Sequence, residues 1–290
     1  MSTPSLPQKN IKQILDALNN IILGKDPQIK LAITCLLANG HLLIEDLPGM
    51  GKTTLSHALA KALGLTYNRI QFTSDIMPAD ILGVSIFEKE NSHNGEQHGT
   101  FRFHPGPIFS QLVLADEINR ATPKAQSALL EAMEEGQVTI EGETRKLPSP
   151  FFVIATQNPI SQSGTFPLPE SQLDRFLMRI SIGYPDAKSE MELLTGVDRR
   201  ALAESLERVV SGDQLTQMQT EATNVHASIT VLEYIQRIIH FTLYDACYSY
   251  GLSPRAGLGL LRAAKAWAYI HQREHLIPED VQAVLPAVID

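Results

Sequence analysis

The sequence has few cysteines, no cluster of basic residues and no long hydrophobic run, and each absence excludes a class of protein. Its two cysteines, Cys35 and Cys247, lie in apolar stretches with helical patterning and form no C-x-x-C pair. We therefore expect buried small side chains rather than a disulfide or a metal site. The longest apolar run, residues 31–39, is too short to cross a bilayer, and the polar N-terminus MSTPSLPQKN does not resemble a signal peptide. These absences predict a soluble, cytoplasmic protein.

The charge balance argues against nucleic acid as the main partner. The 290 residues include 24 Lys and Arg against 32 Asp and Glu, which gives a formal net charge of −8. Nucleic-acid binding depends on Lys and Arg that neutralise phosphates, although a local basic surface inside an oligomer stays open. With 43% hydrophobic and 19% charged residues, the chain has the composition of a globular protein with room for one large and one smaller domain.

Residues 41–54, HLLIEDLPGMGKTT, predict a short buried strand, a tight turn and the start of a helix. Backbone N–H groups at such a helix start attract phosphate, and the helix dipole adds to the attraction. The pattern G-x-x-x-x-G-K-[ST] fits except at Asp46, and an ordinary strand-to-helix turn is the alternative. In the phosphate-loop interpretation, Lys52 reaches the β- and γ-phosphates and the Thr53 hydroxyl holds Mg²⁺. The residues expected at this nucleoside triphosphate site are Pro48, Gly49, Met50, Gly51, Lys52, Thr53 and Thr54.

Strands and helices alternate from residue 42 to residue 183, which predicts a parallel sheet with helices on both faces. Residues 1–10 are polar with two prolines, and we expect them to be loose. The remaining patterns predict strands at residues 41–44, 67–72, 112–115, 151–155 and 177–182, and helices at 11–23, 28–38, 55–63, 78–82 and 124–134.

Two further segments predict β-hairpins inserted into this sheet. Residues 83–103 contain two strand-like runs on either side of a polar tip rich in Asn and Gly, and residues 137–147 contain two more around Glu-Gly-Glu.

After residue 186 the pattern becomes helical, apart from a weak strand signal at residues 230–232. We expect an α/β domain over residues 1–186 and an all-α domain over residues 187–290. The helices predicted in the second domain are 187–195, 213–220, 231–247, 254–271 and 278–288.

The strand at residues 112–115 is followed by two acids, Asp116 and Glu117. Ligands of α/β sheets bind at the carboxyl ends of the strands, so these acids should face the phosphate loop. Phosphoryl transfer needs a carboxylate that positions Mg²⁺, which fits Asp116, and a group that orients the attacking water, which fits Glu117. The alternative is a pair of exposed acids that cap the next helix.

The next strand ends in Thr156-Gln157-Asn158-Pro159, where the amide of Asn158 can bond the attacking water or the γ-phosphate. Its alternative is a simple Asn-Pro turn. Two arginines complete the set of candidates. Arg175 precedes the last strand, and Arg255 stands in the first turn of a C-terminal helix, where a cation suggests an anion nearby.

These residues resemble an AAA+ ATPase of the MoxR family, in the clade with a helix-2 insert that also includes magnesium chelatase and MCM-like motors. The resemblance runs from about residue 23 nearly to the C-terminus. It rests on EDLPGMGKTT, LADEINRATPKAQSALLEAMEE, ATQNP, LPESQLDRF and GLSPRA. It implies an AAA+ P-loop NTPase core with two β-hairpin inserts, followed by a small all-α lid domain.

The family roles carry over to matching positions. The resemblance implies that Asn158 is sensor 1, that Arg175 is the arginine finger reaching the ATP of a neighbouring subunit, and that Arg255 is sensor 2, coupling the lid angle to the γ-phosphate. Arg120 is a possible subunit-interface residue. The Walker A segment is Gly49, Gly51, Lys52, Thr53 and Thr54, the Walker B acids are Asp116 and Glu117, and the nucleotide lies near Leu23 and Gly24 between core and lid.

By the same resemblance the enzyme binds ATP and Mg²⁺ and acts as a ring, with a hexamer expected because the finger is supplied in trans. The leading hypothesis is a chaperone-like ATPase that remodels or matures a partner complex, or inserts a cofactor or metal, together with a von Willebrand factor A domain protein. The alternatives are a magnesium-chelatase-like subunit, an MCM-like nucleic-acid motor and a scaffold that binds ATP without turnover. The acidic or neutral hairpin tips, at residues 90–97 and 141–143, disfavour the nucleic-acid motor.

Overall fold

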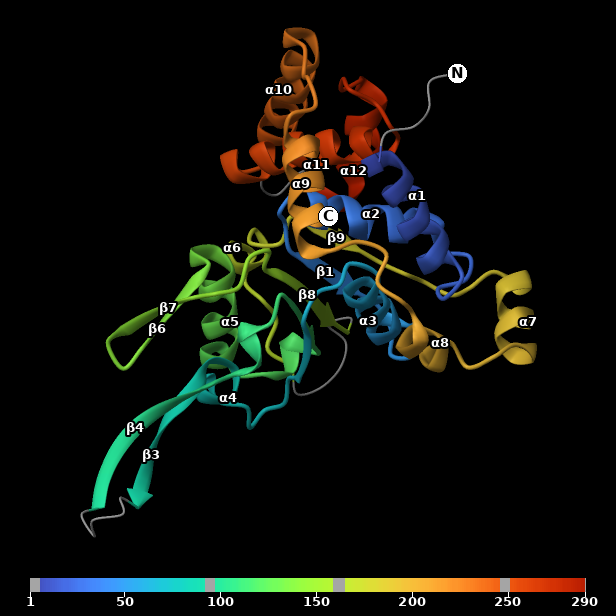
Figure 1. Cartoon of the computed structure of the whole chain (residues 1–290). Helices are drawn as coiled ribbons and strands as arrows, with labels where there is room; N and C mark the ends of the chain where they lie inside the picture. Colours follow the sequence, from blue (N-terminus) through green and yellow to red (C-terminus); the bar gives the residue numbers. More distant parts are fainter. Residues whose placement is uncertain (1–5, 92–96, 159–164, 246–250, 290) are drawn as a thin grey trace.

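The computed structural model describes residues 6–91, 97–158, 165–245 and 251–289. Its centre is a sheet of five parallel strands in the order β2–β5–β8–β1–β9 (Figure 1). The phosphate-loop strand β1 therefore lies between β8 and β9, while β5 lies between β2 and β8. The strands are β1 Leu42–Glu45, β2 Tyr67–Gln71, β5 Leu112–Asp116, β8 Phe152–Gln157 and β9 Met178–Ile180.

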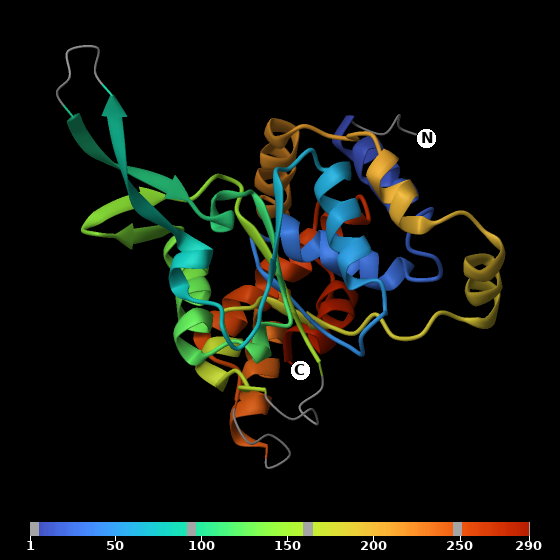
Figure 2. The same cartoon turned by 90° about the horizontal axis from the view of Figure 1, so that it is seen from below.

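Helices cover both faces of the sheet, which confirms the predicted α/β architecture (Figures 1 and 2). One face packs against the first three helices, and the other packs against α4 and α5. The helices of this part are α1 Leu6–Asn19, α2 Asp26–Leu37, α3 Lys52–Ala62, α4 Pro78–Leu82, α5 Pro123–Glu135 and α6 Glu170–Leu173.

Alternation along the strands divides the core into two clusters, because successive side chains of a strand point to opposite faces. Both faces of the sheet are apolar, which explains why the central strands are continuous hydrophobic runs in the sequence. The first cluster takes Leu42, Ile44, Leu112, Leu114, Phe152 and Ile154, and the second takes Leu43, Val113, Ala115, Val153 and Ala155.

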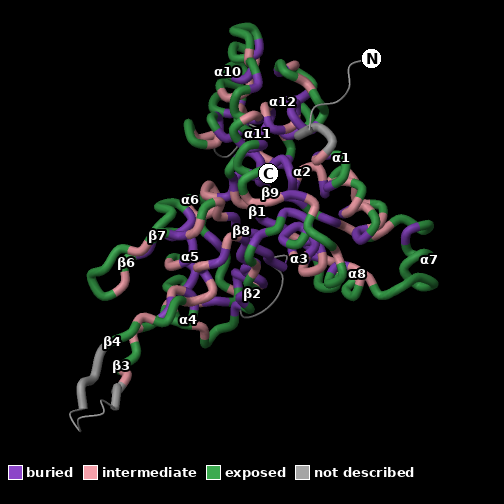
Figure 3. Tube along the Cα trace, viewed as in Figure 1, coloured by how far each residue is buried: buried purple, intermediate pink, exposed green. Residues whose placement is uncertain are grey.

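Both predicted hairpins are present, as β3 Gly83–Asn91 with β4 Gln97–Pro105 and as β6 Gln137–Ile140 with β7 Glu143–Lys146. They project from the same side of the body (Figure 1), and the smaller one is largely exposed (Figure 3). Arg145 of the smaller hairpin lies over the Phe103 ring of the larger one, with its guanidinium carbon 4.0 Å from the ring centroid. The tip of the larger hairpin, residues 92–96, lies outside the described residues.

The C-terminal part is helical, as expected. Its helices contribute to the same core cluster as α1 to α3, and Gln219 of α9 donates to the carbonyl of Leu36 in α2 at 2.9 Å. Among the described residues, no helix has the length and hydropathy needed to cross a membrane. The helices are α7 Ala187–Thr195, α8 Arg199–Ser205, α9 Gly212–Thr223, α10 Ile229–Tyr244, α11 Pro254–Ile270 and α12 Pro278–Ile289.

Several predicted elements were wrong in extent or type. The first helix begins at Leu6 rather than Ile11, because the first turn of a helix tolerates a proline such as Pro7. It also ends at Asn19, and Ile21 and Ile22 are buried in the following turn, where they extend the apolar pattern without extending the helix.

The weak strand signal at residues 230–232 is wrong, because these residues lie in α10. The Ser228 side chain accepts from the Val231 N–H at 3.4 Å and caps that helix. The short helices α6 and α8 were not predicted at all. Cys35 is buried as expected, whereas Cys247 lies outside the described residues.

Candidate functional site

The phosphate loop connects β1 to α3 through a turn that requires glycine. Gly49 and Gly51 have φ of +87° and +83°, a left-handed backbone that disfavours residues with a Cβ. A Cβ at either position would meet no heavy atom within 4 Å, so the conformation rather than lack of space requires glycine. Gly51 is the N-cap of α3, which begins at Lys52. The backbone thus forms the turn and helix start of an anion-binding loop.

Lys52 is a buried cation at the centre of this loop. Its Nζ donates to the carbonyl oxygen of Asp46 at 2.7 Å and to Oδ1 of Asn158 at 3.4 Å. Burial lowers the pKa of the Lys52 ammonium, and the negative charges of Asp116, Asp46 and Glu117 oppose that shift. A buried ammonium whose hydrogen bonds go to a carbonyl and an amide oxygen rather than to a carboxylate suits a site that accepts negatively charged oxygens.

Asp46, the departure from the phosphate-loop pattern, connects the loop to the segment after β9. Its Oδ2 accepts from the Gly183 N–H at 2.6 Å and from the Ser181 hydroxyl at 3.3 Å. Its Oδ1 accepts from the N–H of Leu47 at 2.9 Å. The carboxylate therefore ties the loop to the chain that leads into α7.

At the end of β5, Asp116 is held from both neighbouring strands. Its Oδ1 accepts from the Thr156 hydroxyl of β8 at 2.6 Å. Its Oδ2 accepts from Nε and Nη2 of Arg69 in β2, at 3.1 and 2.6 Å. Neither Thr156 nor Arg69 follows from a local motif, because both contacts depend on the order of strands in the sheet.

Glu117 has φ of +58°, which is uncommon for a residue other than glycine and marks a constrained backbone. Its N–H donates to the Thr156 hydroxyl at 2.9 Å. Its Oε1 accepts from Nδ2 of Asn158 at 3.1 Å, and its Oε2 accepts from Gln71 at 3.1 Å and lies 3.1 Å from Nε of Arg120. The structure thus joins Glu117 directly to Asn158.

These side chains surround a pocket of about 480 Å³, the first pocket, at the carboxyl ends of the strands. The segment between α7 and α8 lines one side of it through Val197 and Asp198, and α8 does so through Arg200; the sequence analysis did not single out these residues. The expected site residues that line the pocket are Pro48, Gly49, Gly51, Lys52, Thr53, Thr54, Asp116, Glu117 and Asn158.

Three expected nucleotide-binding residues lie outside the lining of this pocket. Met50 packs against the first core cluster. Leu23 and Gly24 belong to the turn before α2, and a Cβ on Gly24 would lie 2.5 Å from the Ser189 hydroxyl at the start of α7. Leu23 and Gly24 therefore lie next to the start of α7 rather than in the lining of the first pocket.

The oxygen atoms around the first pocket could coordinate a magnesium ion if phosphate oxygens and water filled the rest of its coordination shell. Within the described part of the chain, no group of three His, Cys, Asp or Glu could hold a metal on its own. Mg²⁺ commonly binds through one or two protein oxygens, phosphate oxygens and waters. The Thr53 hydroxyl and the Asp116 carboxylate supply such oxygens next to the phosphate loop.

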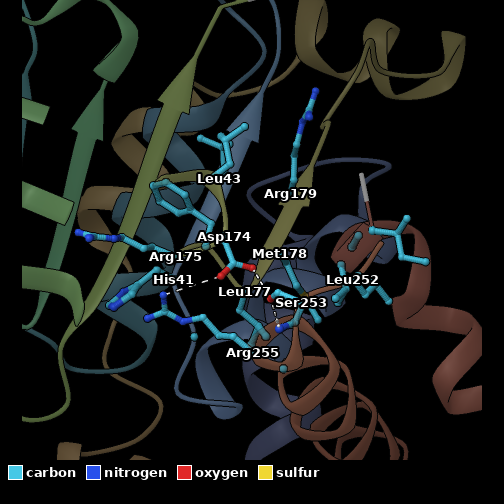
Figure 4. Close-up of a pocket in the computed structure, with 18 of the residues that line it drawn as sticks. His41, Leu43, Asp174, Arg175, Leu177, Met178, Arg179, Leu252, Ser253 and Arg255 are labelled. Carbon is cyan, nitrogen blue, oxygen red and sulfur yellow. Dashed lines mark hydrogen bonds and ion pairs between the residues drawn. The ribbon is translucent and has the colours of Figure 1, made fainter. Parts of the chain in front are cut away.

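The second pocket, of about 760 Å³, lies at the opposite edge of the sheet and contains both candidate arginines (Figure 4). Glu134 of α5 binds both of them, with its Oε2 3.0 Å from Arg175 and its Oε1 3.1 Å from Arg255. Asp174 accepts from the Ser253 hydroxyl at 2.8 Å and lies 3.9 Å from Arg255. The cluster joins the chain before β9 to the start of α11.

The position of Arg255 bears on which γ-phosphate it could reach. A sensor 2 residue acting on its own γ-phosphate would lie at the phosphate loop, which follows the carboxyl end of β1. The second pocket is instead lined by Gly40 and His41, which precede β1, and by Phe176 and Leu177, which precede β9. Because parallel strands begin at the same edge of a sheet, Arg175 and Arg255 both lie away from the phosphate loop of their own subunit.

His41 lines the second pocket as a structural residue. Its Nδ1 accepts from the Val153 N–H at 3.1 Å, which leaves Nε2 to donate to the Met133 carbonyl at 3.2 Å. Burial lowers the pKa of His41 to about 4, so the ring is neutral at pH 7. The ring therefore joins β1, β8 and α5 without supplying charge.

Comparison with known proteins gives matches over nearly the whole chain. The model of the ATPase family associated with various cellular activities matches residues 41–178, and that of the AAA lid domain matches residues 240–290. A crystal structure from Cytophaga hutchinsonii, provisionally described as an ATPase, has a TM-score of 0.84 and 36% identity. The match covers 97% of this chain and 86% of that one.

Three curated relatives extend this result. The uncharacterised protein YeaC of Bacillus subtilis is 44% identical, with 94% of this chain and 83% of the relative covered. Chaperone MoxR1 of Mycobacterium tuberculosis is 36% identical over 96% of this chain and 74% of its own length. Protein MoxR of Paracoccus denitrificans is 31% identical over 94% and 85%, respectively. Together with the sheet order and the phosphate loop, these matches show that the chain belongs to the MoxR family of AAA+ ATPases.

Proposed function

We propose that the first pocket binds ATP with Mg²⁺ and hydrolyses it, and that the contact between Glu117 and Asn158 carries this assignment. The two side chains are 3.1 Å apart at the ends of adjacent strands and line the same pocket as Lys52. Glu117 would orient and deprotonate the attacking water, and Asn158 would hold that water or the γ-phosphate. Bound Mg²⁺ would neutralise charge on the β- and γ-phosphates.

The chain's own groups divide the remaining work. Lys52 and the backbone N–H groups from Gly49 to Thr54 would bind the phosphates. The Thr53 hydroxyl and Asp116 would hold the metal. Leu23 and Gly24, next to α7, would lie on the base side of the nucleotide.

We further propose that subunits associate head to tail in a ring, with six subunits as the expected number. The separation of the two pockets supports this arrangement, because Arg175 lies at the edge of the sheet opposite the phosphate loop of its own subunit, and a neighbour's nucleotide would bring it a phosphate to bind. Arg255 shares that position and would act on the same neighbour rather than on its own γ-phosphate. Exposed apolar side chains of α7 and the segment after it, Met191, Leu194 and Val197, are suited to a subunit contact, and Val197 also lines the first pocket.

In the cell, the ATPase would remodel or mature a partner protein complex, with residues 187–290 acting as the lid. The name of the mycobacterial relative, a chaperone, supports this class of function. The family resemblance favours one form of this function, in which the ATPase acts together with a von Willebrand factor A domain protein, including in metal or cofactor insertion. A magnesium-chelatase-like subunit is the alternative, and it would need a porphyrin substrate.

The test is the ATPase rate per subunit as a function of protein concentration. We expect the rate to rise with concentration, because the finger comes from a neighbour, and Arg175→Ala to lose about 10³-fold or more of it. Glu117→Gln should be inactive at every concentration while still binding nucleotide. A rate per subunit that is independent of concentration, with Arg175→Ala as active as wild type, would contradict the ring mechanism.

A further inference from the structure

The two acids at the end of β5 are both held by side chains of β2. Arg69 and Gln71 are two residues apart, so they point to the same face of the strand, and Gln71 is paired in register with Asp116. Arg69 donates twice to Asp116, Gln71 donates to Glu117, and Nη2 of Arg69 also donates to the Gln71 amide oxygen at 2.6 Å. One strand thus supplies a continuous set of donors to both acids.

The Arg69 contact fills one of the two carboxylate oxygens of Asp116. Oδ1 of Asp116 accepts from the Thr156 hydroxyl, and Oδ2 accepts from Nε and Nη2 of Arg69. A cation that binds Asp116 through Oδ2 must therefore share or replace the guanidinium, and one that binds through Oδ1 would be a second positive charge on the same carboxylate. Because both are positive, the two cations oppose each other at this carboxylate.

The burial of the two partners makes an exchange feasible. The Asp116 side chain is 10% exposed, whereas the Arg69 side chain is 47% exposed. A nearly buried carboxylate is costly without a cation, so Asp116 keeps a partner throughout. An exposed guanidinium loses little when it leaves an ion pair, because water takes over its hydrogen bonds.

We propose that Arg69 is the internal counter-ion of Asp116 and that Mg²⁺ displaces it, so that Arg69 sets the Mg²⁺ concentration at which the site loads. The inference rests on the proposed function, because it takes Asp116 as a metal-holding residue. Arg69 lines the same pocket as Lys52 and Thr53, so the displaced guanidinium stays next to the phosphates of a bound nucleotide. Metal and nucleotide binding would therefore favour each other through this residue.

The test is binding of a fluorescent, non-hydrolysable ATP analogue to the full chain at increasing Mg²⁺ concentration, read as anisotropy. Arg69→Met removes the competing cation, and we expect half-saturation at about fivefold lower Mg²⁺, as befits a partly exposed ion pair. Binding without Mg²⁺ should become weaker, because one positive charge has left the pocket. If Arg69 had only a structural role, its loss would not lower the half-saturating Mg²⁺ concentration and at the same time weaken binding of the analogue without Mg²⁺.

Arg237→Met is the matched control. Arg237 lies in α10, lines neither pocket and is 3.9 Å from Glu233. The variant removes the same charge from an exposed ion pair outside the site, so its half-saturating Mg²⁺ concentration should stay within about twofold of wild type in 0.15 M salt. Arg69→Gln provides a second variant should the Met protein fail to fold.

Asp116→Asn separates the inference from the function on which it rests. If Asp116→Asn abolishes the Mg²⁺ dependence while Arg69→Met leaves the half-saturation unchanged or raises it, the counter-ion role of Arg69 is wrong and the metal assignment stands. If Asp116→Asn binds with the Mg²⁺ dependence of wild type, Asp116 does not hold the metal, and both the inference and that part of the proposed function fail.

Discussion

At the scale of single residues, Asp46 shows how a departure from a motif can have its own structural role. The phosphate-loop pattern has glycine at this position, but Asp46 is not among the residues with positive φ. Its backbone therefore does not need glycine. Its nearly buried carboxylate instead accepts from Leu47, Ser181 and Gly183.

Restoring the motif with Asp46→Gly should therefore damage the protein. Loss of hydrogen bonds to a charged acceptor, together with the added freedom of glycine, should lower the free energy of unfolding by about 2–4 kcal/mol. Urea denaturation measures this change. Asp46→Asn keeps one acceptor oxygen and should lose about half as much, whereas a glycine variant as stable as wild type would show that these bonds contribute nothing.

Some residues of the site could be predicted from a local sequence pattern, whereas the contacts of others depend on the order of strands in the sheet. Lys52, Thr53 and Asp116 were predicted because a strand followed by a polar turn identifies the edge at which ligands bind. Arg69 and Thr156 were not assigned their contacts with Asp116, since these depend on β5 lying between β2 and β8. No local pattern encodes that order.

At the scale of elements, most long periodic segments were predicted to within a few residues, but the first helix was misplaced because Ile21 and Ile22 continue its apolar pattern past its end at Asn19. The helices α6 and α8 are too short to show a repeat. The hairpins were predicted from their polar turns, but the contact of Arg145 with Phe103 between them was not, because it joins residues far apart in sequence.

The last turn of α5 carries a feature that only the assembled structure reveals. Glu134 stands near the carboxyl end of the helix, where a negative charge is unfavourable, and two arginines from other elements neutralise it. The carboxylate therefore occupies the guanidinium groups that are proposed to bind a neighbour's phosphates.

Glu134→Gln should release both arginines and raise the ATPase rate about two- to fivefold at protein concentrations that limit assembly. The reason is that the neighbour's nucleotide no longer competes with a carboxylate for the guanidinium groups. Glu135→Gln, an exposed neighbour outside the lining of the second pocket, is the control. If Glu134→Gln lowers the rate as Arg175→Ala does, Glu134 orients the arginines instead of restraining them.

At the scale of the whole molecule, the phosphate loop and the pair Arg175 and Arg255 lie at opposite ends of the parallel strands, and we propose that they are two halves of one site. A subunit that presents its phosphate loop on one side and its arginines on the other forms a heterologous interface, in which different surfaces meet. Such interfaces close into rings when the rotation between subunits allows it. The family resemblance implied a finger acting in trans, and the placement of Arg255 beside Arg175 adds a second arginine to the same surface.

Mixing two inactive variants tests this arrangement directly. Glu117→Gln lacks a working site but presents Arg175, whereas Arg175→Ala has a working site but no finger. In an equal mixture that assembles at random, about a quarter of the interfaces combine an intact site with an intact finger, so about a quarter of the wild-type rate should return. The control mixes Arg175→Ala with a variant that carries both Glu117→Gln and Arg175→Ala. No subunit in that mixture has the finger, so it should stay inactive. If the first mixture is also no more active than its components, each subunit completes its own site, and the opposite placement of the two pockets does not reflect a trans mechanism.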